Sequence, residues 1–206
     1  MKYIISRYNH DMAPILKYAK EDFVLYDRSE EKINDYRMIP VPNIGSDIFD
    51  KFTYIIDNYD NLPEIAVYTK ANLFQYITQE EFETALKKAE KEKVLVPLLT
   101  QNHKTYMPIC FYSDDGMYNE LNNRWYLAQH GCKHLGRPDE LMSILGMKDK
   151  EYLKFAPGSN YIVPRANILQ YPKEFYITLR KFLDWDVYPG EAQIMERGLF
   201  YLWSMT

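Results

Sequence analysis

The chain has 206 residues, a length that fits one domain able to bury roughly 70% of its unfolded surface. Its 47% hydrophobic and 26% charged residues are ordinary for a globular protein in water. The net charge of −4 argues against a protein that binds nucleic acid by neutralising phosphates. Two cysteines are too few for a disulfide framework, and no apolar stretch approaches the ~20 residues of a membrane span. We therefore expect a cytoplasmic protein that has no membrane span and no nucleic-acid partner.

The first half of the chain alternates short apolar runs with helical patterns. Helices are predicted around residues 12–19, with Asp11 as a possible cap, and after the turn at residues 42–46. Another begins at Thr78, which has capping-box spacing to Glu81. The predicted strands are residues 2–6, 22–27, 64–69 and 94–100. This alternation predicts an α/β fold with a mainly parallel central sheet flanked by helices.

The second half begins with a less regular stretch, residues 101–157, which we interpret as an excursion beside the main sheet. It contains one predicted helix, from Pro138 to Leu145. A strand at residues 159–165 follows, then a helix entered at Pro172 and a final helix from Glu191.

Polar residues follow three of the predicted strands. They are residues 6–9, residues 26–28 and the group formed by Thr69, Lys70 and Asn72. Ligands of open parallel sheets bind beyond the carboxyl ends of the strands, so these residues predict one shared pocket. The alternative is that strand ends are loops and loops are usually polar.

Glu196 stands out in the final helix because it projects from nearly the same face as the apolar Met195, Leu199 and Trp203. A carboxylate on an apolar face is costly unless it is paired, and such groups are often functional. The alternative is a structural ion pair with an arginine such as Arg165 or Arg180.

The sequence contains weak candidates for metal binding. Asp114 and Asp115 are explained first by a turn, and Asp184 and Asp186 by the end of a helix. The cysteine spacing does not suit zinc. The sequence contains no glycine-rich dinucleotide loop, no P-loop and no nucleophile elbow.

Several segments occur in the order of a domain family of unknown function known from fungi, bacteria and large viruses. They are YIISRYNHD, VLYDRS, PNIGSD, YIIDNYDNLPEIAVYTKANLF, FAPGSNYIVPRANILQYPKEFY and MERGLFYLW. The NIGSDI and YTK pieces are also similar to a rhamnan-synthesis family. Both resemble nucleotide-sugar glycosyltransferases of the GT-A fold, and the resemblance spans nearly the whole chain except the middle excursion.

The resemblance implies a single GT-A-like, Rossmann-like domain over residues 1–206. Residues 1–100 would form the nucleotide-binding half and residues 101–206 the acceptor-side half. The implied activity is transfer of a sugar from a UDP- or dTDP-type donor to a hydroxyl of a glycan acceptor, with Mn²⁺ or Mg²⁺ bridging the diphosphate. The alternatives are a non-catalytic carbohydrate-binding or scaffold protein of the same fold and a metal-dependent nucleotide-sugar hydrolase.

The resemblance also implies roles for individual residues. Glu196 and Arg197 would lie at the reacting centre, and Asn72 would stand at the metal position. The acceptor would meet Gly158, Ser159 and Asn160. The implied nucleotide-sugar contacts are Arg7, Tyr8, Asn9, Asp27, Asn43, Gly45, Asp47 and Lys70.

The sequence departs from the family pattern at two of these positions. The segment Gly45-Ser46-Asp47 lacks an arginine that the pattern carries, and Asn72 replaces an aspartate. Lys70 is then the candidate that supplies positive charge to the diphosphate in place of a metal. The turn at residues 43–46 is expected to offer backbone N–H groups to an anion or to sugar hydroxyls.

Overall fold

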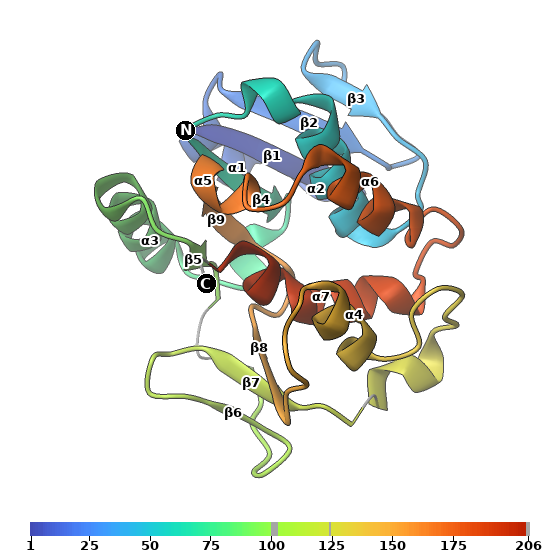
Figure 1. Ribbon diagram of the computed structural model, residues 1–206. Coiled ribbons are helices and arrows are strands. Elements are labelled where there is room, and N and C mark those ends of the chain that lie inside the picture. Colours follow the sequence, from blue (N-terminus) through green and yellow to red (C-terminus); the bar gives the residue numbers. More distant parts are fainter. Residues whose placement is uncertain (100–102, 124, 205–206) are drawn as a thin grey trace.

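The computed structural model describes residues 1–99, 103–123 and 125–204, which form a mixed α/β domain around a six-stranded sheet (Figure 1). The strand order is β3-β2-β1-β4-β9-β5. Strands β1 to β4 run parallel, whereas β9 is antiparallel to both of its neighbours. The prediction of a mainly parallel sheet flanked by helices is therefore confirmed. The six strands are β1 (Lys2–Arg7), β2 (Phe23–Asp27), β3 (Met38–Pro40), β4 (Ile65–Lys70), β5 (Val96–Pro97) and β9 (Tyr161–Pro164).

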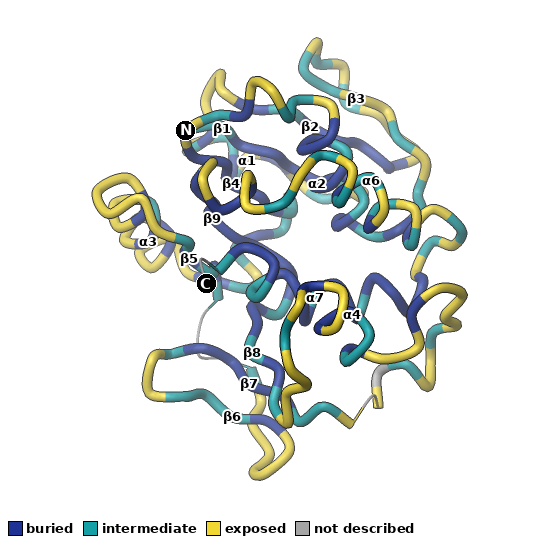
Figure 2. The backbone as a smooth tube through the Cα atoms, viewed as in Figure 1, coloured by how far each residue is buried: buried dark blue, intermediate teal, exposed yellow. Residues whose placement is uncertain are grey.

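Successive side chains of each strand point to opposite sides of the sheet, and each side is buried in an apolar cluster. Ile4 of β1 faces one apolar cluster, and its neighbours Tyr3 and Ile5 face the other. The first face is covered by α2 (Ser46–Asp57), α6 (Lys173–Lys181) and α7 (Gly190–Trp203), and the second by α1 (Ala13–Ala19) and α3 (Gln79–Glu92). The strands accordingly form the dark, buried centre of the domain, while α3 turns an exposed side outward (Figure 2).

Local signals in the sequence fix several helix ends as expected. The Thr78 side chain accepts a hydrogen bond from the Glu81 N–H, and the Glu81 carboxylate accepts one from the Thr78 N–H, which completes a capping box at α3. The Asp11 carboxylate accepts a hydrogen bond from the Ala13 N–H, but the N-cap residue of α1 is Met12, which makes no side-chain cap bond. The predicted strand at residues 94–100 is confirmed only over Val96–Pro97, and residue 100 lies outside the described residues.

The middle of the chain contains a second sheet that the sequence did not predict. It is antiparallel, with the order β6-β7-β8, and lies below the main sheet in Figure 1. Its strands are β6 (Cys110–Tyr112), β7 (Tyr118–Leu121) and β8 (Tyr152–Phe155). Helix α4 (Pro138–Ile144) packs on α7, close to the predicted span of Pro138 to Leu145. The remaining elements are η1 (Tyr59–Asn61), η2 (Leu73–Gln75), η3 (Trp125–Gln129) and α5 (Arg165–Ile168).

The two halves of the sequence are interleaved in space. Strand β9, from the second half, lies between β4 and β5 of the first half. Among the helices of the described residues, none combines the length and the apolar character that a membrane crossing needs.

Candidate functional site

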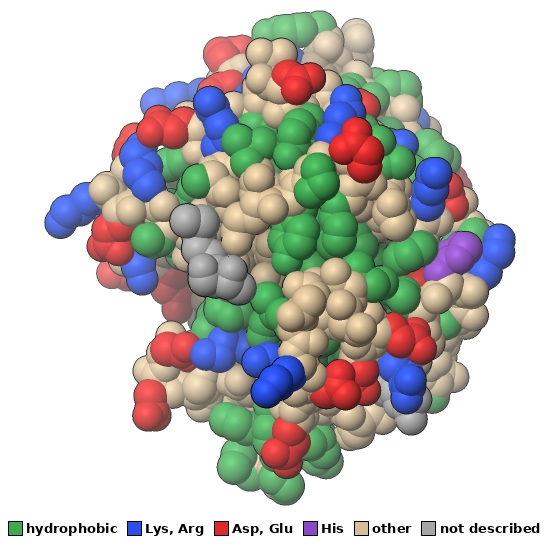
Figure 3. Space-filling model, in the orientation of Figure 1, with side chains coloured by type: hydrophobic (Ala, Val, Ile, Leu, Met, Phe, Trp, Pro, Cys, Tyr) green, Lys and Arg blue, Asp and Glu red, His purple; other side chains and the backbone are tan. Residues whose placement is uncertain are grey.

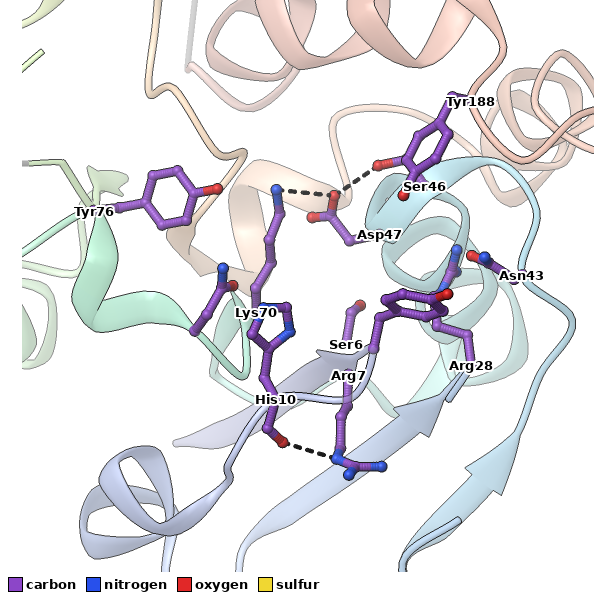
Figure 4. A pocket seen from close by; sticks show the side chains of 12 residues that line it. Ser6, Arg7, His10, Arg28, Asn43, Ser46, Asp47, Lys70, Tyr76 and Tyr188 are labelled. Atoms are coloured by element: carbon purple, nitrogen blue, oxygen red, sulfur yellow. Dashed lines mark hydrogen bonds and ion pairs between the residues drawn. The ribbon is translucent and has the colours of Figure 1, made fainter. Parts of the chain in front are cut away.

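A polar cavity of about 180 Å³ lies at the carboxyl ends of β1 and β4 (Figure 4). The order of the parallel strands reverses between β1 and β4, because β2 and β3 extend to one side of β1 and β4 lies on the other. Such a switch point leaves a crevice beyond the strand ends, which is the usual ligand site of open α/β sheets. The cavity is lined by Ser6, Arg7, Tyr8, His10, Arg28, Asn43, Ser46, Asp47, Lys70, Asn72, Tyr76 and Tyr188.

Asp47 and Lys70 form the charged centre of this cavity. Asp47 lies in the first turn of α2, and its Oδ1 is 3.5 Å from the Nζ of Lys70 at the end of β4. The other carboxylate oxygen, Oδ2, pairs with the Nζ of buried Lys51, one turn along α2, and accepts a 2.5 Å hydrogen bond from the Ser159 hydroxyl. Figure 4 shows the Lys70 side chain reaching across the cavity toward Asp47.

The electrostatics of this cluster keep Asp47 and Lys70 charged at neutral pH, whereas burial lowers the pKa of Lys51. Burial alone would raise the pKa of Asp47, but the Lys51 and Lys70 ammonium groups outweigh it and hold that pKa well below its usual range. Burial would lower the pKa of Lys70, yet the carboxylates of Asp47 and Glu196 raise it above its ordinary value. Because its side chain is 25% exposed, Lys70 can still meet a ligand with its charge intact.

The turn before β9 joins three elements of the site through its own hydrogen bonds. The Gly158 N–H donates to Glu196 Oε1 at 2.7 Å, Ser159 donates to Asp47, and Asn160 Oδ1 accepts from the Lys70 N–H at 2.9 Å. Gly158 has a φ of +90°, and a Cβ there would clash with the Tyr76 ring. Ser159 is also in the left-handed region, with a φ of +60°.

These three residues are not placed to contact an acceptor as expected. Ser159 and Asn160 are almost completely buried, with 1% and 0% of their surface exposed. The Ser159 hydroxyl bonds Asp47 of α2 and Asn160 Oδ1 accepts from the Lys70 N–H of β4, while Asn160 Nδ2 is buried with no hydrogen-bond partner among the described residues. In the structure these residues therefore position Asp47, Lys70 and Glu196.

Glu196 and Arg197, the two expected catalytic residues, have different environments. Glu196 keeps 19% of its side chain exposed, accepts from Gly158 and lies 3.4 Å from Arg197 Nη1. The alternative interpretation was a structural ion pair with an arginine such as Arg165 or Arg180. Those two side chains instead donate to the Pro63 carbonyl and to Thr53, and the arginine that Glu196 contacts is Arg197. Arg197 is buried and forms a two-point ion pair with Glu120 of β7 at 2.7 and 3.2 Å. Arg197 thus fixes the second sheet to α7, and its guanidinium group also contacts Glu196.

Arg7 and Asp27 form a structural pair at the ends of β1 and β2. The Arg7 guanidinium points away from the cavity in Figure 4 and contacts both oxygens of Asp27, at 2.9 and 3.2 Å. It also bonds the hydroxyl of Ser29, which in turn accepts from the Asn9 N–H. Asp27 is fully buried and does not line the cavity, nor does Asn9, whereas Tyr8 stands exposed at the rim.

This pair predicts an acid-sensitive contribution to stability. Burial would raise the pKa of Asp27, but hydrogen bonds from Ser29 and Ile33 and the charge of Arg7 lower it. Such a carboxyl stabilises the fold above its unfolded pKa of about 3.9, and the stabilisation is lost as the pH falls through the folded value. We expect Asp27→Asn to lower the free energy of unfolding by about 1–2 kcal/mol at pH 7 and to flatten its decline below pH ~4. Urea titrations at several pH values would measure the free energy of unfolding at pH 7 and its decline in acid. If the free energies of the two proteins declined in parallel, the acid sensitivity would not come from Asp27.

The turn before α2 brings Asn43 and Asp47 to the cavity, but it does not offer the expected anion-binding N–H groups. The Gly45 N–H donates to the Asp186 carbonyl at 2.8 Å and the Ser46 N–H to the Val187 carbonyl at 3.3 Å. Gly45 has a φ of +66°, and a Cβ there would lie 2.7 Å from the Leu183 carbonyl oxygen. The glycine therefore allows α2 to start against the 183–187 segment, and both N–H groups are used inside the fold.

Arg28 belongs to the polar residues 26–28 that the sequence placed at this edge, whereas its partner Asp50 and the lining residues Tyr76 and Tyr188 were missed. Arg28 donates to Asp50 at 2.5 Å and to the Ile44 carbonyl, which ties β2 to the start of α2. Burial raises the pKa of Asp50 to about 6, although the Arg28 charge opposes this shift. A usable signal existed, because Asp47, Asp50 and Lys51 share the apolar face of α2. No such signal marks Tyr76 or the exposed Tyr188. The centroid of the Tyr76 ring lies 5.3 Å from Lys70 Nζ.

The residues of this cavity do not suit a divalent cation held by protein ligands. Hard cations want several oxygen ligands, usually with carboxylates among them. Asn72 Oδ1 is buried without a hydrogen-bond partner among the described residues, but Asn72 offers a single amide oxygen. The nearby carboxylate, Asp47, is already bound by Lys51, Ser159 and Lys70. In residues 1–99, 103–123 and 125–204, no cluster of three or more His, Cys, Asp or Glu side chains could hold a metal.

Comparison with known proteins places the chain in one family. Residues 4–206 match the family described as "Protein of unknown function (DUF3431)", and the chain belongs to it. No curated protein and no solved structure matches the chain.

Proposed function

We propose that the protein is a glycosyltransferase with a GT-A-like fold that takes its sugar from a UDP- or dTDP-type donor and passes it to a hydroxyl of a glycan acceptor. The observation that carries this proposal is a charged lysine, Lys70, held at the switch point of a parallel sheet inside a polar cavity. The expected division of roles follows from the charges and exposure of the residues around it.

The diphosphate would bind against Lys70. A positioned cation stabilises negative charge that develops on a leaving group, and it acts strongly where the surroundings are partly buried. Asp47 holds the Lys70 ammonium group in place, and Ser6 and Asn43 add hydrogen-bonding groups to the cavity wall. The exposed rings of Tyr8 and Tyr188 at the rim suit stacking of a nucleobase or a sugar.

Lys70 takes the charge-neutralising role in this proposal because the described residues do not form a site for Mn²⁺ or Mg²⁺. Asn72 stands where the family pattern has an aspartate for a metal, and Lys70, two residues earlier, can supply the positive charge instead. We therefore expect nucleotide binding that needs no added metal.

Glu196 is the proposed base. In the transfer step the acceptor oxygen forms a bond to the anomeric carbon, the bond from that carbon to the diphosphate oxygen breaks, and the acceptor proton passes to the Glu196 carboxylate. The bonding electrons leave with the nucleoside diphosphate, whose charge Lys70 balances. The partial exposure of Glu196 and its electrostatic coupling to Lys70 support this assignment.

Calorimetry with UDP and dTDP, in Mn²⁺ and then in EDTA, tests the proposal. Binding in both buffers supports it, and binding only with Mn²⁺ would overturn the role given to Lys70.

A non-catalytic carbohydrate-binding protein is the second candidate, favoured by an Asp47 that is fully engaged within the fold. Absence of nucleotide binding at millimolar ligand would favour that candidate. Product analysis with donor and acceptor then separates transfer from hydrolysis.

Lys70→Ala is expected to weaken UDP or dTDP binding by about 2 kcal/mol, roughly thirtyfold in Kd, because a charge-assisted contact to the diphosphate is lost. Lys70→Arg should recover part of the affinity. Lys88→Ala, which removes the same charge from the exposed side of α3, is the matched control and should bind as the unmodified protein does. Equal affinities for all of these proteins would remove Lys70 from the nucleotide site.

A further inference from the structure

A second cavity, of about 420 Å³, lies on the three-stranded sheet β6-β7-β8. Its wall includes Lys104, Tyr106, Ile109, Glu120, Asn123 and Trp125. Tyr106, Ile109 and Trp125 are each between 44% and 59% exposed, which is unusual for large apolar side chains in one place. Hydrophobic side chains gather at this lower end of the molecule, around the β6–β7 hairpin (Figure 3).

The walls of this second cavity are held in shape by backbone hydrogen bonds. Tyr106 and Cys110 exchange backbone hydrogen bonds of 2.9 and 3.0 Å across a β-bridge. The Leu121 N–H donates to the Ile109 carbonyl at 2.7 Å, which fastens the segment to β7. A cavity fixed in this way is largely formed before a ligand arrives.

The chemistry of the second cavity suits a neutral ligand rich in hydroxyl groups. The carboxylate of Glu120 is balanced by Arg197, so it can accept hydrogen bonds without presenting an unpaired charge. Lys104 and Asn123 add polar groups beside the exposed rings of Tyr106 and Trp125. Aromatic faces with polar groups at their edges fit sugar rings, whose C–H faces are apolar and whose rims are hydroxylated.

Two connections join this cavity to the one at Lys70. The Tyr76 ring, in the wall of the first cavity, lies 6.4 Å from the His103 ring, which lies 5.8 Å from the Tyr118 ring in the wall of the second. Arg197 also bonds Glu120 of the second cavity and contacts Glu196, which holds the turn beside Lys70. The two cavities are therefore linked through His103 and through Arg197, although no described residue lines both of them.

We propose that the second cavity binds the glycan acceptor, as a neutral oligosaccharide whose rings stack on Tyr106 and Trp125. This inference rests on the proposed function, and it assigns to the β6-β7-β8 sheet the acceptor contact that buried Ser159 and Asn160 cannot make. The acceptor end that receives the sugar would extend from the second cavity toward Glu196, which is linked to Glu120 through Arg197.

Saturation-transfer NMR and calorimetry with cellohexaose, maltohexaose and chitohexaose test the proposal without nucleotide. We expect at least one of the three to bind the unmodified protein, and the double variant Tyr106→Ala/Trp125→Ala to bind it about tenfold more weakly or not at all. Both side chains are largely exposed, so their removal should leave the fold intact. Tyr36→Ala, which removes an 87% exposed tyrosine outside this cavity, is the matched control and should bind normally.

The outcomes separate this inference from the proposed function. Oligosaccharide binding that depends on Tyr106 and Trp125 supports the second cavity whether or not UDP binds. Nucleotide binding together with no binding of any of the three oligosaccharides overturns this inference and leaves the proposed function standing. Equal losses in the double variant and in Tyr36→Ala also overturn it.

Discussion

Glu196→Gln is expected to lower kcat for sugar transfer by at least ~100-fold while the Kd for UDP or dTDP stays the same, since general base catalysis contributes about 10²–10⁴-fold. The glutamine amide cannot take up the acceptor proton. Its side-chain oxygen can still accept the Gly158 N–H, which Glu196 Oε1 now does at 2.7 Å. The substitution therefore removes the chemistry and keeps the contact. The measurements are initial rates of product formation and calorimetry of the nucleotide.

A purely structural role for Glu196 would give a different result. The free energy of unfolding would then fall with the activity, and nucleotide affinity would fall as the turn at Gly158 loosened. Glu174→Gln, in the exposed first turn of α6, is the matched control for loss of one carboxylate charge and should change neither quantity. An unchanged kcat in Glu196→Gln would remove Glu196 as the base.

Glu191→Gln, five residues earlier in the same helix, is expected to lower the free energy of unfolding by about 3 kcal/mol. Glu191 is fully buried, and its Oε1 accepts hydrogen bonds from the N–H groups of Lys133, His134 and Leu135 at 2.6, 2.5 and 3.2 Å. A neutral amide oxygen accepts these bonds more weakly, and the amide N–H₂ brings two donors into a buried position. Urea denaturation followed by circular dichroism gives the change directly.

The two glutamates should thus separate stability from activity. Glu191→Gln should remain able to bind nucleotide wherever it is still folded, because Glu191 lies away from the cavity lining. Glu174→Gln again serves as the control, with an expected change within ~0.5 kcal/mol. A stability loss as small in Glu191→Gln as in Glu174→Gln would show that the three N–H contacts contribute little.

The sequence predicted the main sheet because its signals are local and regular. Apolar runs alternate with helical patterns, Thr78 and Glu81 mark a helix start, and Pro138 marks another. The polar ends of β1 and β4 also predicted the place of the cavity, because strand order alone brings carboxyl ends together. Lys70 could therefore be placed at this edge from the strand pattern, whereas Asp47 was added to the site only by the family resemblance.

The second sheet was missed because its strands are too short for their alternation to stand out. Strand β6 has three residues and β7 and β8 have four each, and turns and polar residues surround them. Strand β3, also three residues long, was missed for the same reason. Such strands form because their partners are present, and the partner of β7 on one side, β8, lies far away in the sequence.

The burial of charge was equally hard to predict. A helical pattern singled out Glu196, yet Glu191 is the more deeply buried carboxylate of α7. Its partners are backbone N–H groups nearly sixty residues earlier, at Lys133 to Leu135. Side-chain patterns carry no information about backbone donors. The ion pair of Arg197 with Glu120 could not be predicted either, because Glu120 lies in the unexpected second sheet.

Strand β9 has a consequence for the order in which the protein can be completed during translation. It is the only partner through which β4 and β5 connect within the described sheet, and it ends at Pro164. Until residue 164 has been synthesised, one edge of β4 lacks its partner strand and α3 lacks the contacts that it makes with β9. The nascent chain therefore carries an unpaired strand edge from the synthesis of β4 until β9 is complete, and a holdase chaperone bound in that interval would prevent wrong pairing.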